Sequence, residues 1–227
     1  MQLTMGKKFR KDFEQCCYRY SKKTSDIVCI AVTKNRDIDS IECLYNDGYR
    51  HFGENRFQEA QRKFEQWSLR KEIDLHFLGP IQSNKLKGIV NLVDCVQSVD
   101  SFDLCKKIDL AAGQYNKCMR VFFQINLDKN KKNGFVDLES CMHALAGSAE
   151  LPNIRVEGVM GIASDSQEKS AICSEFRYLH ESFCKLQSAR GGGFLKHCSM
   201  GMSEDFQYAI REGSTMIRIG RILFESL

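Results

Sequence analysis

The chain has 227 residues, a formal net charge of +4 and 43% apolar residues. At roughly 100–200 residues per domain, this length indicates one domain or two, and the composition is typical of a globular protein rather than a disordered one. The charge is too small to indicate nucleic-acid binding. The longest clean apolar run, residues 27–32, is far shorter than the roughly 20 residues that a membrane helix needs. We therefore expect neither a nucleic-acid partner nor a membrane partner.

The 11 cysteines indicate a reducing compartment rather than a disulfide framework. Secreted disulfide-rich chains are usually shorter, denser in cysteine and preceded by an apolar signal segment. Here no Cys-x-x-Cys pair occurs, and the basic N-terminal stretch has no apolar core. We predict a cytoplasmic protein whose thiols are mostly buried.

Short apolar runs alternate with helical patterns along the chain, after an extra helix expected within residues 1–25. Strands are predicted at residues 27–32, 49–52, 75–78, 92–96, 121–126, 154–160, 194–198 and 216–219. Helices are predicted at residues 37–46, 55–67, 101–115, 169–188 and 204–211.

Alternating strands and helices indicate a parallel sheet. Eight such units predict an α/β fold, a single (β/α)8 TIM-type barrel over residues 27–224 that makes residues 1–227 one domain. An open doubly wound sheet is the alternative.

Sites in parallel α/β folds form at the carboxyl ends of the strands. Lys34 follows the first strand and shares the parity of Ile30 and Val32, so it is expected at the barrel mouth. Desolvation there would favour a neutral, nucleophilic amine. The alternative is a lysine whose stem extends from the strand end into solvent.

Polar residues also follow the second and third strands. Glu54 and Asn55 are expected to face the mouth after the turn at Gly53. His76, within the third strand, is expected to be a hydrogen-bonded core residue. Because no His, Cys or Asp spacing is typical of zinc, no metal is predicted.

The last quarter of the chain carries the pattern of a phosphate site. Barrel phosphate sites are frequently built from the loops after strands seven and eight, where this chain has residues 199–203 and Gly220. Small residues expose backbone N–H groups, and Ser203 is predicted both to donate a hydroxyl and to cap the helix 204–211. A reactive lysine with a phosphate site indicates a Schiff-base aldolase for a sugar phosphate or a protein that binds pyridoxal phosphate (PLP).

Five motifs favour a PLP-binding protein over an aldolase. Residues 31–34 (AVTK), 51–55 (HFGEN), 76–85 (HFLGPIQSNK), 199–205 (SMGMSED) and 213–220 (GSTMIRIG) occur in this order. Over residues 27–224 the chain resembles the PLP homeostasis protein family, also called the proline synthase co-transcribed family. The resemblance implies a barrel like the N-terminal domain of alanine racemase.

The resemblance also implies a PLP-binding function and its residues. The protein would carry, buffer or deliver PLP, bound as an internal aldimine at Lys34. Asn55 would line the pocket, Arg218 would lie against the pyridine nitrogen, and the phosphate would be held by Met202, Ser203, Gly220 and Arg221. Arg221 departs from the threonine or serine usual in the family, which removes a hydroxyl donor. The Lys-x-Gly motif of the family is present at Lys132, with a proposed role in PLP release.

Binding without efficient turnover is expected. Arg218 only donates hydrogen bonds, so it would keep the pyridine nitrogen unprotonated and weaken PLP as an electron sink. The chain also ends at Leu227, before the second domain that supplies the opposite base in alanine racemase. We predict a monomer that contacts PLP-dependent apoenzymes transiently and has no catalytic residues. A weak PLP-dependent amino-acid racemase is the alternative.

Overall fold

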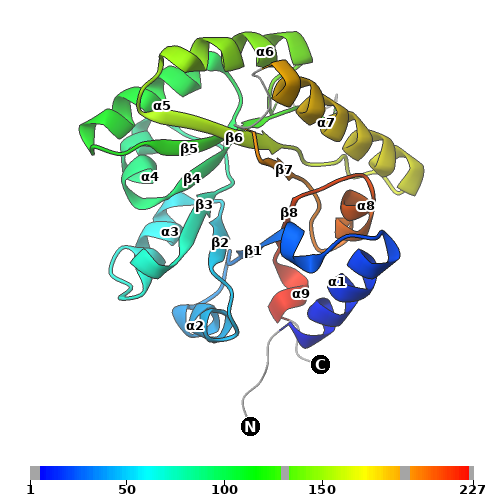
Figure 1. Cartoon of the computed structure of the whole chain (residues 1–227). Coiled ribbons are helices and arrows are strands. Elements are labelled where there is room, and N and C mark those ends of the chain that lie inside the picture. Colours follow the sequence, from blue (N-terminus) through cyan, green and yellow to red (C-terminus); the bar gives the residue numbers. More distant parts are fainter. Residues whose placement is uncertain (1–5, 129–132, 190–194, 225–227) are drawn as a thin grey trace.

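The computed structural model describes residues 6–128, 133–189 and 195–224. Within them, eight parallel strands pair in chain order, and the last pairs with the first to close a barrel (Figure 1). The strands are β1 Val28–Val32, β2 His51–Glu54, β3 Asp74–Phe77, β4 Cys95–Val99, β5 Met119–Gln124, β6 Ile154–Met160, β7 His197–Ser199 and β8 Met216–Ile219. The predicted (β/α)8 barrel is confirmed, and the open doubly wound sheet is excluded.

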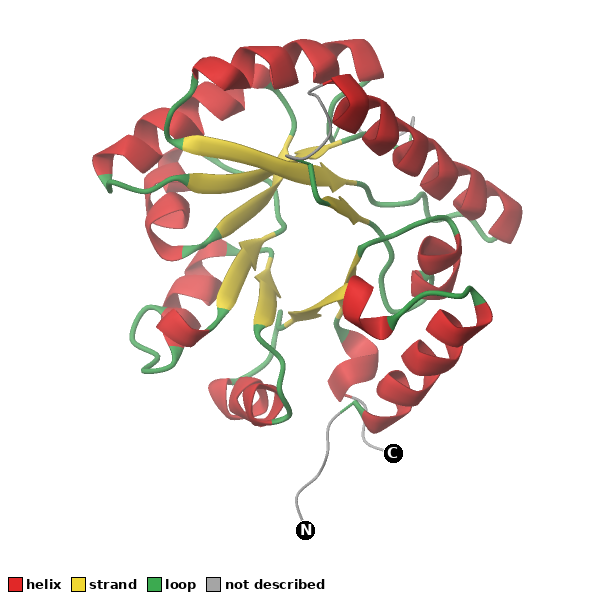
Figure 2. Cartoon of the chain, viewed as in Figure 1, coloured by secondary structure: helices red, strands yellow, loops and turns green. Residues whose placement is uncertain are grey.

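Helices surround the strands on the outside of the barrel (Figure 2). They are α1 Lys7–Arg19, α2 Ile38–Asn46, α3 Phe57–Phe64, α4 Leu86–Leu92, α5 Phe102–Gln114, α6 Leu138–Gly147, α7 Lys169–Ala189, α8 Phe206–Arg211 and α9 Arg221–Phe224. The extra helix α1 lies beside α8 and α9, so the first and last helices of the chain are neighbours (Figure 1). One of these contacts is an edge-to-face pair of Phe9 and Phe206, with ring centroids 5.5 Å apart.

Several predicted boundaries are wrong by a few residues. The predicted strand 92–96 begins too early because Leu92 ends α4, a short helix that the sequence analysis did not predict. Helix α6 was also not predicted, although Asp137 caps it by accepting a hydrogen bond from the Ser140 N–H at 2.7 Å. Of the predicted strand 194–198, residue 194 lies outside the described residues, and β7 begins at His197.

The alternation of side chains along each strand divides the interior into two apolar regions. Ile30 and four residues from other strands form a small cluster inside the barrel, Cys95, Phe122, Met160 and Met216. A much larger core fills the space between the strands and the surrounding helices. Above and below the small inner cluster the lumen carries buried polar side chains, among them Arg218 toward one end and His76 toward the other.

The cysteines confirm the prediction that most of the thiols are buried. All 11 are free, and seven are buried: Cys16, Cys17, Cys95, Cys105, Cys141, Cys173 and Cys198. Burial raises the pKa of Cys105 and of Cys141 to about 12, so these two thiols stay protonated and unreactive. None of the helices in the described part of the chain has the length and apolar character that a membrane crossing requires.

Candidate functional site

A cavity of about 820 Å³ opens at the carboxyl ends of the strands. It receives residues from the loops after β1, β2, β3, β6, β7 and β8. All seven site residues predicted from the sequence line it: Lys34, Asn55, Met202, Ser203, Arg218, Gly220 and Arg221. The barrel therefore brings together side chains that are up to 187 positions apart in the chain (221 − 34 = 187).

Lys34 enters this cavity because it continues the inward face of β1. Val32, two residues earlier, lines the same cavity and packs against the inner cluster. The side chain of Lys34 is exposed, however, so the predicted desolvation of its amine is wrong. The strand ends at Val32, and the lysine lies beyond the apolar part of the barrel.

The loop that carries Lys34 is anchored on the outer side of the sheet. Thr33 is fully buried, and its hydroxyl donates to Glu54 Oε1 at 2.6 Å. The Lys63 ammonium donates to the Thr33 carbonyl at 2.6 Å and to Glu54 Oε1 at 2.8 Å. These bonds tie β1, β2 and α3 together directly beneath Lys34.

Glu54 therefore does not face the mouth, which corrects the prediction from sequence. In a strand, neighbouring residues point to opposite faces, so Asn55 can line the cavity only if Glu54 points outward. Burial raises the pKa of Glu54, and its bonds from Lys63 and Thr33 act in the opposite direction. The role of Glu54 is to support the loop rather than to contact a ligand.

Asn55 presents an unsatisfied oxygen beside the cavity. Its Oδ1 is buried and has no hydrogen-bond partner among the described residues. Gly79 packs against the same residue, and a Cβ at Gly79 would lie 2.1 Å from the Asn55 carbonyl oxygen. A glycine is required there because only a hydrogen leaves room for the backbone of Asn55. A ligand with a hydrogen-bond donor would satisfy the buried oxygen.

Arg218 lies at the floor of the cavity and is 5% exposed. Its guanidinium donates to the Ser199 carbonyl, to the Ser199 hydroxyl and to the Gly161 carbonyl, each at 2.8 Å. Burial lowers the pKa of Arg218 to about 10, partly offset by the Asp205 carboxylate, so the group is still charged at neutral pH. The cavity thus holds a fixed, permanently donating cation.

The loops after β7 and β8 meet at the other side of the cavity. Gly201 adopts a φ of +94°, a left-handed conformation that favours glycine, and turns the first loop. The Gly220 N–H donates to the Ser203 hydroxyl at 3.3 Å, which joins the two loops. Ser203 is not the predicted helix cap, because α8 begins only at Phe206 and its N-cap is Asp205.

Arg221 makes an ion pair with Glu204 across the same two loops. Both side chains are exposed, so this pair contributes little to stability. Asp205 Oδ1 accepts a hydrogen bond from the Met202 N–H at 2.5 Å. Burial raises the pKa of Asp205. An anion bound here would compete with Asp205 for the Met202 N–H.

Sequence reasoning missed the segment after β6. Its contribution to the cavity includes Ile162, Ser164 and Lys169, and Tyr208 adds a phenol ring from α8. The Ser164 N–H and hydroxyl donate to the two carboxylate oxygens of Glu175, at 2.8 and 2.6 Å. Reading the residues after every predicted strand, including the sixth, would have found this segment. Lys132, the other predicted lysine, lies outside the described residues.

A chain of hydrogen bonds runs from this cavity through the lumen. The Arg218 guanidinium donates to the Ser199 hydroxyl, which donates to Gln97 Oε1 at 2.8 Å. Gln97 Nε2 then lies 3.0 Å from His76 Nδ1. The predicted character of His76 as a buried, hydrogen-bonded residue is confirmed, and the chain connects the site with the opposite end of the barrel.

Comparison with known proteins defines the class to which this barrel and site belong. The model of the alanine racemase N-terminal domain family matches residues 17–226. An alanine racemase structure from Clostridium difficile 630 superposes with a TM-score of 0.71 at 15% identity, covering 96% of this chain and 56% of that one. At such identity the likeness shows the fold alone. The chain is thus a barrel of the alanine racemase N-terminal class.

Relatives of higher sequence identity define the family within this class. A protein of Aquifex aeolicus (strain VF5) named pyridoxal phosphate homeostasis protein is 33% identical, covering 93% of this chain and 92% of the relative. The protein of the same name from Escherichia coli (strain K12) is 30% identical over 91% of this chain and 88% of its own length. The structure of PipY from Synechococcus elongatus PCC7942 with PLP bound superposes with a TM-score of 0.82 at 31% identity, covering 94% of this chain and 99% of that one. The chain belongs to the pyridoxal phosphate homeostasis protein family.

Proposed function

We propose that this protein binds PLP and carries, buffers or delivers it within the cell. The observation that carries the proposal is the meeting of Lys34, Arg218 and the Ser203–Gly220 contact around one cavity. An amine, a fixed cation and a pair of loop donors correspond to the aldehyde, the pyridine nitrogen and the phosphate of PLP. A relative of 31% identity has been solved with PLP bound, which supports the same ligand here.

The chemistry of the lining residues fits this cofactor. We assign a Schiff-base linkage to Lys34, whose exposed amine can reach a bound aldehyde. The Ser203 hydroxyl and the Gly220 and Met202 N–H groups would hold the phosphate, with Arg221 exchanging Glu204 for it. The unpartnered Oδ1 of Asn55 would accept a hydrogen bond from the cofactor.

We propose further that the protein has little or no turnover. PLP supplies an electron sink in enzymes when its pyridine nitrogen is protonated, which a carboxylate partner favours. Arg218 lies at the floor of the cavity, and its bonds to the Ser199 and Gly161 carbonyls fix its guanidinium there. Because arginine only donates hydrogen bonds, Arg218 would keep the pyridine nitrogen unprotonated and would weaken carbanion chemistry.

The absorption spectrum of the purified protein tests PLP binding at Lys34. We expect a Schiff-base band near the visible edge in the wild type, and its loss in Lys34→Ala. Lys169→Ala is the matched control because Lys169 is a second lysine of the same cavity, and this variant should keep the band. A band that survives in Lys34→Ala after desalting would contradict the assignment. A colourless wild type trapped by borohydride only with a sugar phosphate present would indicate an aldolase instead.

The proposed lack of turnover is tested with amino-acid substrates. Holoprotein incubated with L-amino acids should produce no D-enantiomer above the rate of free PLP. Steady production would favour a weak racemase. We also propose that the protein acts as a cytoplasmic monomer that delivers PLP to apoenzymes. Reactivation of a PLP-dependent apoenzyme, faster with holoprotein than with equal free PLP, would support delivery.

A further inference from the structure

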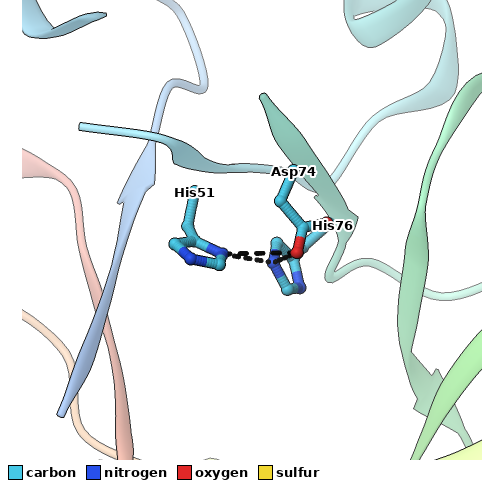
Figure 3. A group of neighbouring side chains, drawn as sticks. All are labelled: His51, Asp74 and His76. Carbon is cyan, nitrogen blue, oxygen red and sulfur yellow. Dashed lines mark hydrogen bonds and ion pairs between the residues drawn. The ribbon is translucent and has the colours of Figure 1, made fainter. Parts of the chain in front are cut away.

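Three side chains converge at the end of the barrel opposite to the cofactor cavity. His51 and Asp74 begin β2 and β3 and are register partners, and His76 lies two residues further along β3. Figure 3 shows the two imidazole rings and the carboxylate turned toward one another. His51 Nδ1 lies 3.3 Å from His76 Nε2 and 3.4 Å from Asp74 Oδ2, and His76 Nε2 lies 3.6 Å from Asp74 Oδ2.

The two contacts of the Asp74 carboxylate with the imidazole rings are long for direct hydrogen bonds. Charge-assisted hydrogen bonds from a nitrogen to a carboxylate are about 2.7–2.9 Å long. The contacts of Asp74 Oδ2 with the two rings, at 3.4 and 3.6 Å, exceed that range. The three atoms lie 3.3–3.6 Å from one another, so one ion placed between them would contact all three.

The spacing matches the edges of a tetrahedral metal site. Zinc bonds of about 2.0–2.2 Å place neighbouring tetrahedral ligands about 3.3–3.6 Å apart, whereas octahedral Mg²⁺ bonds of about 2.0–2.1 Å place them about 2.9 Å apart. The observed edges of 3.3, 3.4 and 3.6 Å correspond to the tetrahedral case. Two imidazoles and one carboxylate are also a ligand set that suits zinc rather than Mg²⁺ or Ca²⁺.

We propose that His51 Nδ1, His76 Nε2 and Asp74 Oδ2 bind Zn²⁺ in the N-terminal mouth of the barrel, with water as the fourth ligand. No metal was predicted from the sequence because no His, Cys or Asp spacing is typical of zinc: His51 lies 23 and 25 positions before Asp74 and His76 (74 − 51 = 23; 76 − 51 = 25). The closed barrel supplies the proximity that the sequence does not display.

Access from solvent also favours this site. The His51 side chain is 36% exposed, which leaves a path for the ion and for its water.

The surrounding residues orient the ligands. Arg120 contacts Asp74 Oδ1, so the carboxylate presents Oδ2 alone. Arg120 Nη1 lies 3.9 Å from the Glu157 carboxylate, which partly balances the nearby positive charge. Gln97 Nε2 lies 3.0 Å from His76 Nδ1 and holds the ring in its orientation. Outer partners of this kind fix the ligand geometry in metal sites.

Titration of the chelator-washed protein with Co²⁺, followed by competition with Zn²⁺, tests the site. We expect the intense visible bands of four-coordinate Co²⁺ at one equivalent, displaced by Zn²⁺. His51→Gln and Asp74→Asn should weaken Zn²⁺ binding by 10-fold or more. Because Zn²⁺ bound to the folded state raises the melting temperature, the wild type should be stabilised and His51→Gln should not. The half-exposed position of His51 makes this variant the one least expected to disturb folding.

The control is the surface pair of His180 and Cys184, with Sγ and Nε2 3.9 Å apart. The double variant His180→Gln/Cys184→Ser should bind Co²⁺ as the wild type does. Loss of the bands in that variant, unchanged binding in His51→Gln and Asp74→Asn, or no stoichiometric binding by the wild type would each overturn the proposal. These readouts do not involve PLP, so they are independent of the function proposed above.

Discussion

At the scale of single residues, the alternation of side chains along a strand decides which of two neighbouring residues faces the site. Lys34 was correctly predicted at the mouth because Val32 shares its face of β1. The same reasoning separates Asn55, which lines the cavity, from Glu54, which is buried on the outer side. The motif contains both residues, but the sequence alone does not show which of them faces the barrel interior. The structure shows it, because β2 ends at Glu54 with that side chain outward and Asn55 follows on the inward face.

Asp74 gives a residue-scale prediction about acid stability. Its pKa in the folded protein lies well below the ordinary value of 3.8, so the unfolded chain binds more protons as the pH falls. Asp74 therefore makes its full contribution to the free energy of unfolding at pH values above 3.8, and this contribution decreases as the pH falls below 3.8. Between pH 5 and pH 3 the loss is about 1 kcal/mol.

The measurement is urea unfolding at a series of pH values with a chelator present. Between pH 5 and pH 3 the free energy of unfolding of Asp74→Asn should fall by about 1 kcal/mol less than that of the wild type. An equal fall in the two proteins would mean that Asp74 does not have a low pKa in the folded state.

At the scale of elements, the site depends on contacts that lie outside the cavity. Lys63 of α3 bonds to the Thr33 carbonyl and the Glu54 carboxylate, so a helix and two strands fix the loop that bears Lys34. The contacts among Thr33, Glu54 and Lys63 were not predicted, because the sequence pattern places Lys63 on the polar face of an amphipathic helix. Its burial arises from the docking of α3 on the barrel, which is a tertiary effect.

Glu54→Gln tests the contribution of this anchor. Removing the charge leaves Lys63 with Glu59 as its remaining carboxylate, and we expect a loss of about 1–3 kcal/mol in the free energy of unfolding. Affinity for PLP should also fall because the loop bearing Lys34 is less fixed. Glu204→Gln, which breaks an exposed ion pair, is the control and should change stability by less than about 0.5 kcal/mol. Equal stability of the two variants would contradict the anchoring role.

Strands β6 and β8 have the predicted bounds. Both are buried over most of their length, although Arg155 and Glu157 interrupt the apolar pattern of β6 and Arg218 that of β8. Helix α4 was missed because it is short and contains Gly88, which packs against Phe57 of α3. A glycine lowers helix propensity, and the packing that compensates for it is visible only in the fold.

At the scale of the whole molecule, the barrel joins two polar ends through its lumen. Ser199 and Gln97 connect Arg218 in the proposed cofactor cavity with His76 in the proposed metal site. The seven residues proposed to bind the cofactor were found from motifs that resemble a known family. His51 and His76 begin two of these motifs, but their sequence spacing did not indicate a metal, because strand pairing brings them together with Asp74.

Gln97→Met tests whether this connection matters. The variant keeps the size of the side chain but leaves the Ser199 hydroxyl and His76 Nδ1 without their partner in the lumen. We expect a loss of about 1–3 kcal/mol in the free energy of unfolding and a weaker affinity for PLP, since Ser199 helps to orient Arg218. Gln61→Met, at a partly exposed position whose amide donates to Glu65, is the control. If Gln97→Met and Gln61→Met have the same free energy of unfolding and the same affinity for PLP, the chain of hydrogen bonds through the lumen has no energetic role.

Covalent attachment of PLP to Lys34 is the basis of the proposed function, and it is tested by mapping the attachment site. Holoprotein is reduced with borohydride, digested and analysed by peptide mass spectrometry. We predict a phosphopyridoxyl group on the peptide that contains Lys34, at near-stoichiometric yield, and none on the peptide that contains Lys169. Modification of Lys169 or of another lysine in place of Lys34, or no modified peptide at all, would contradict the account.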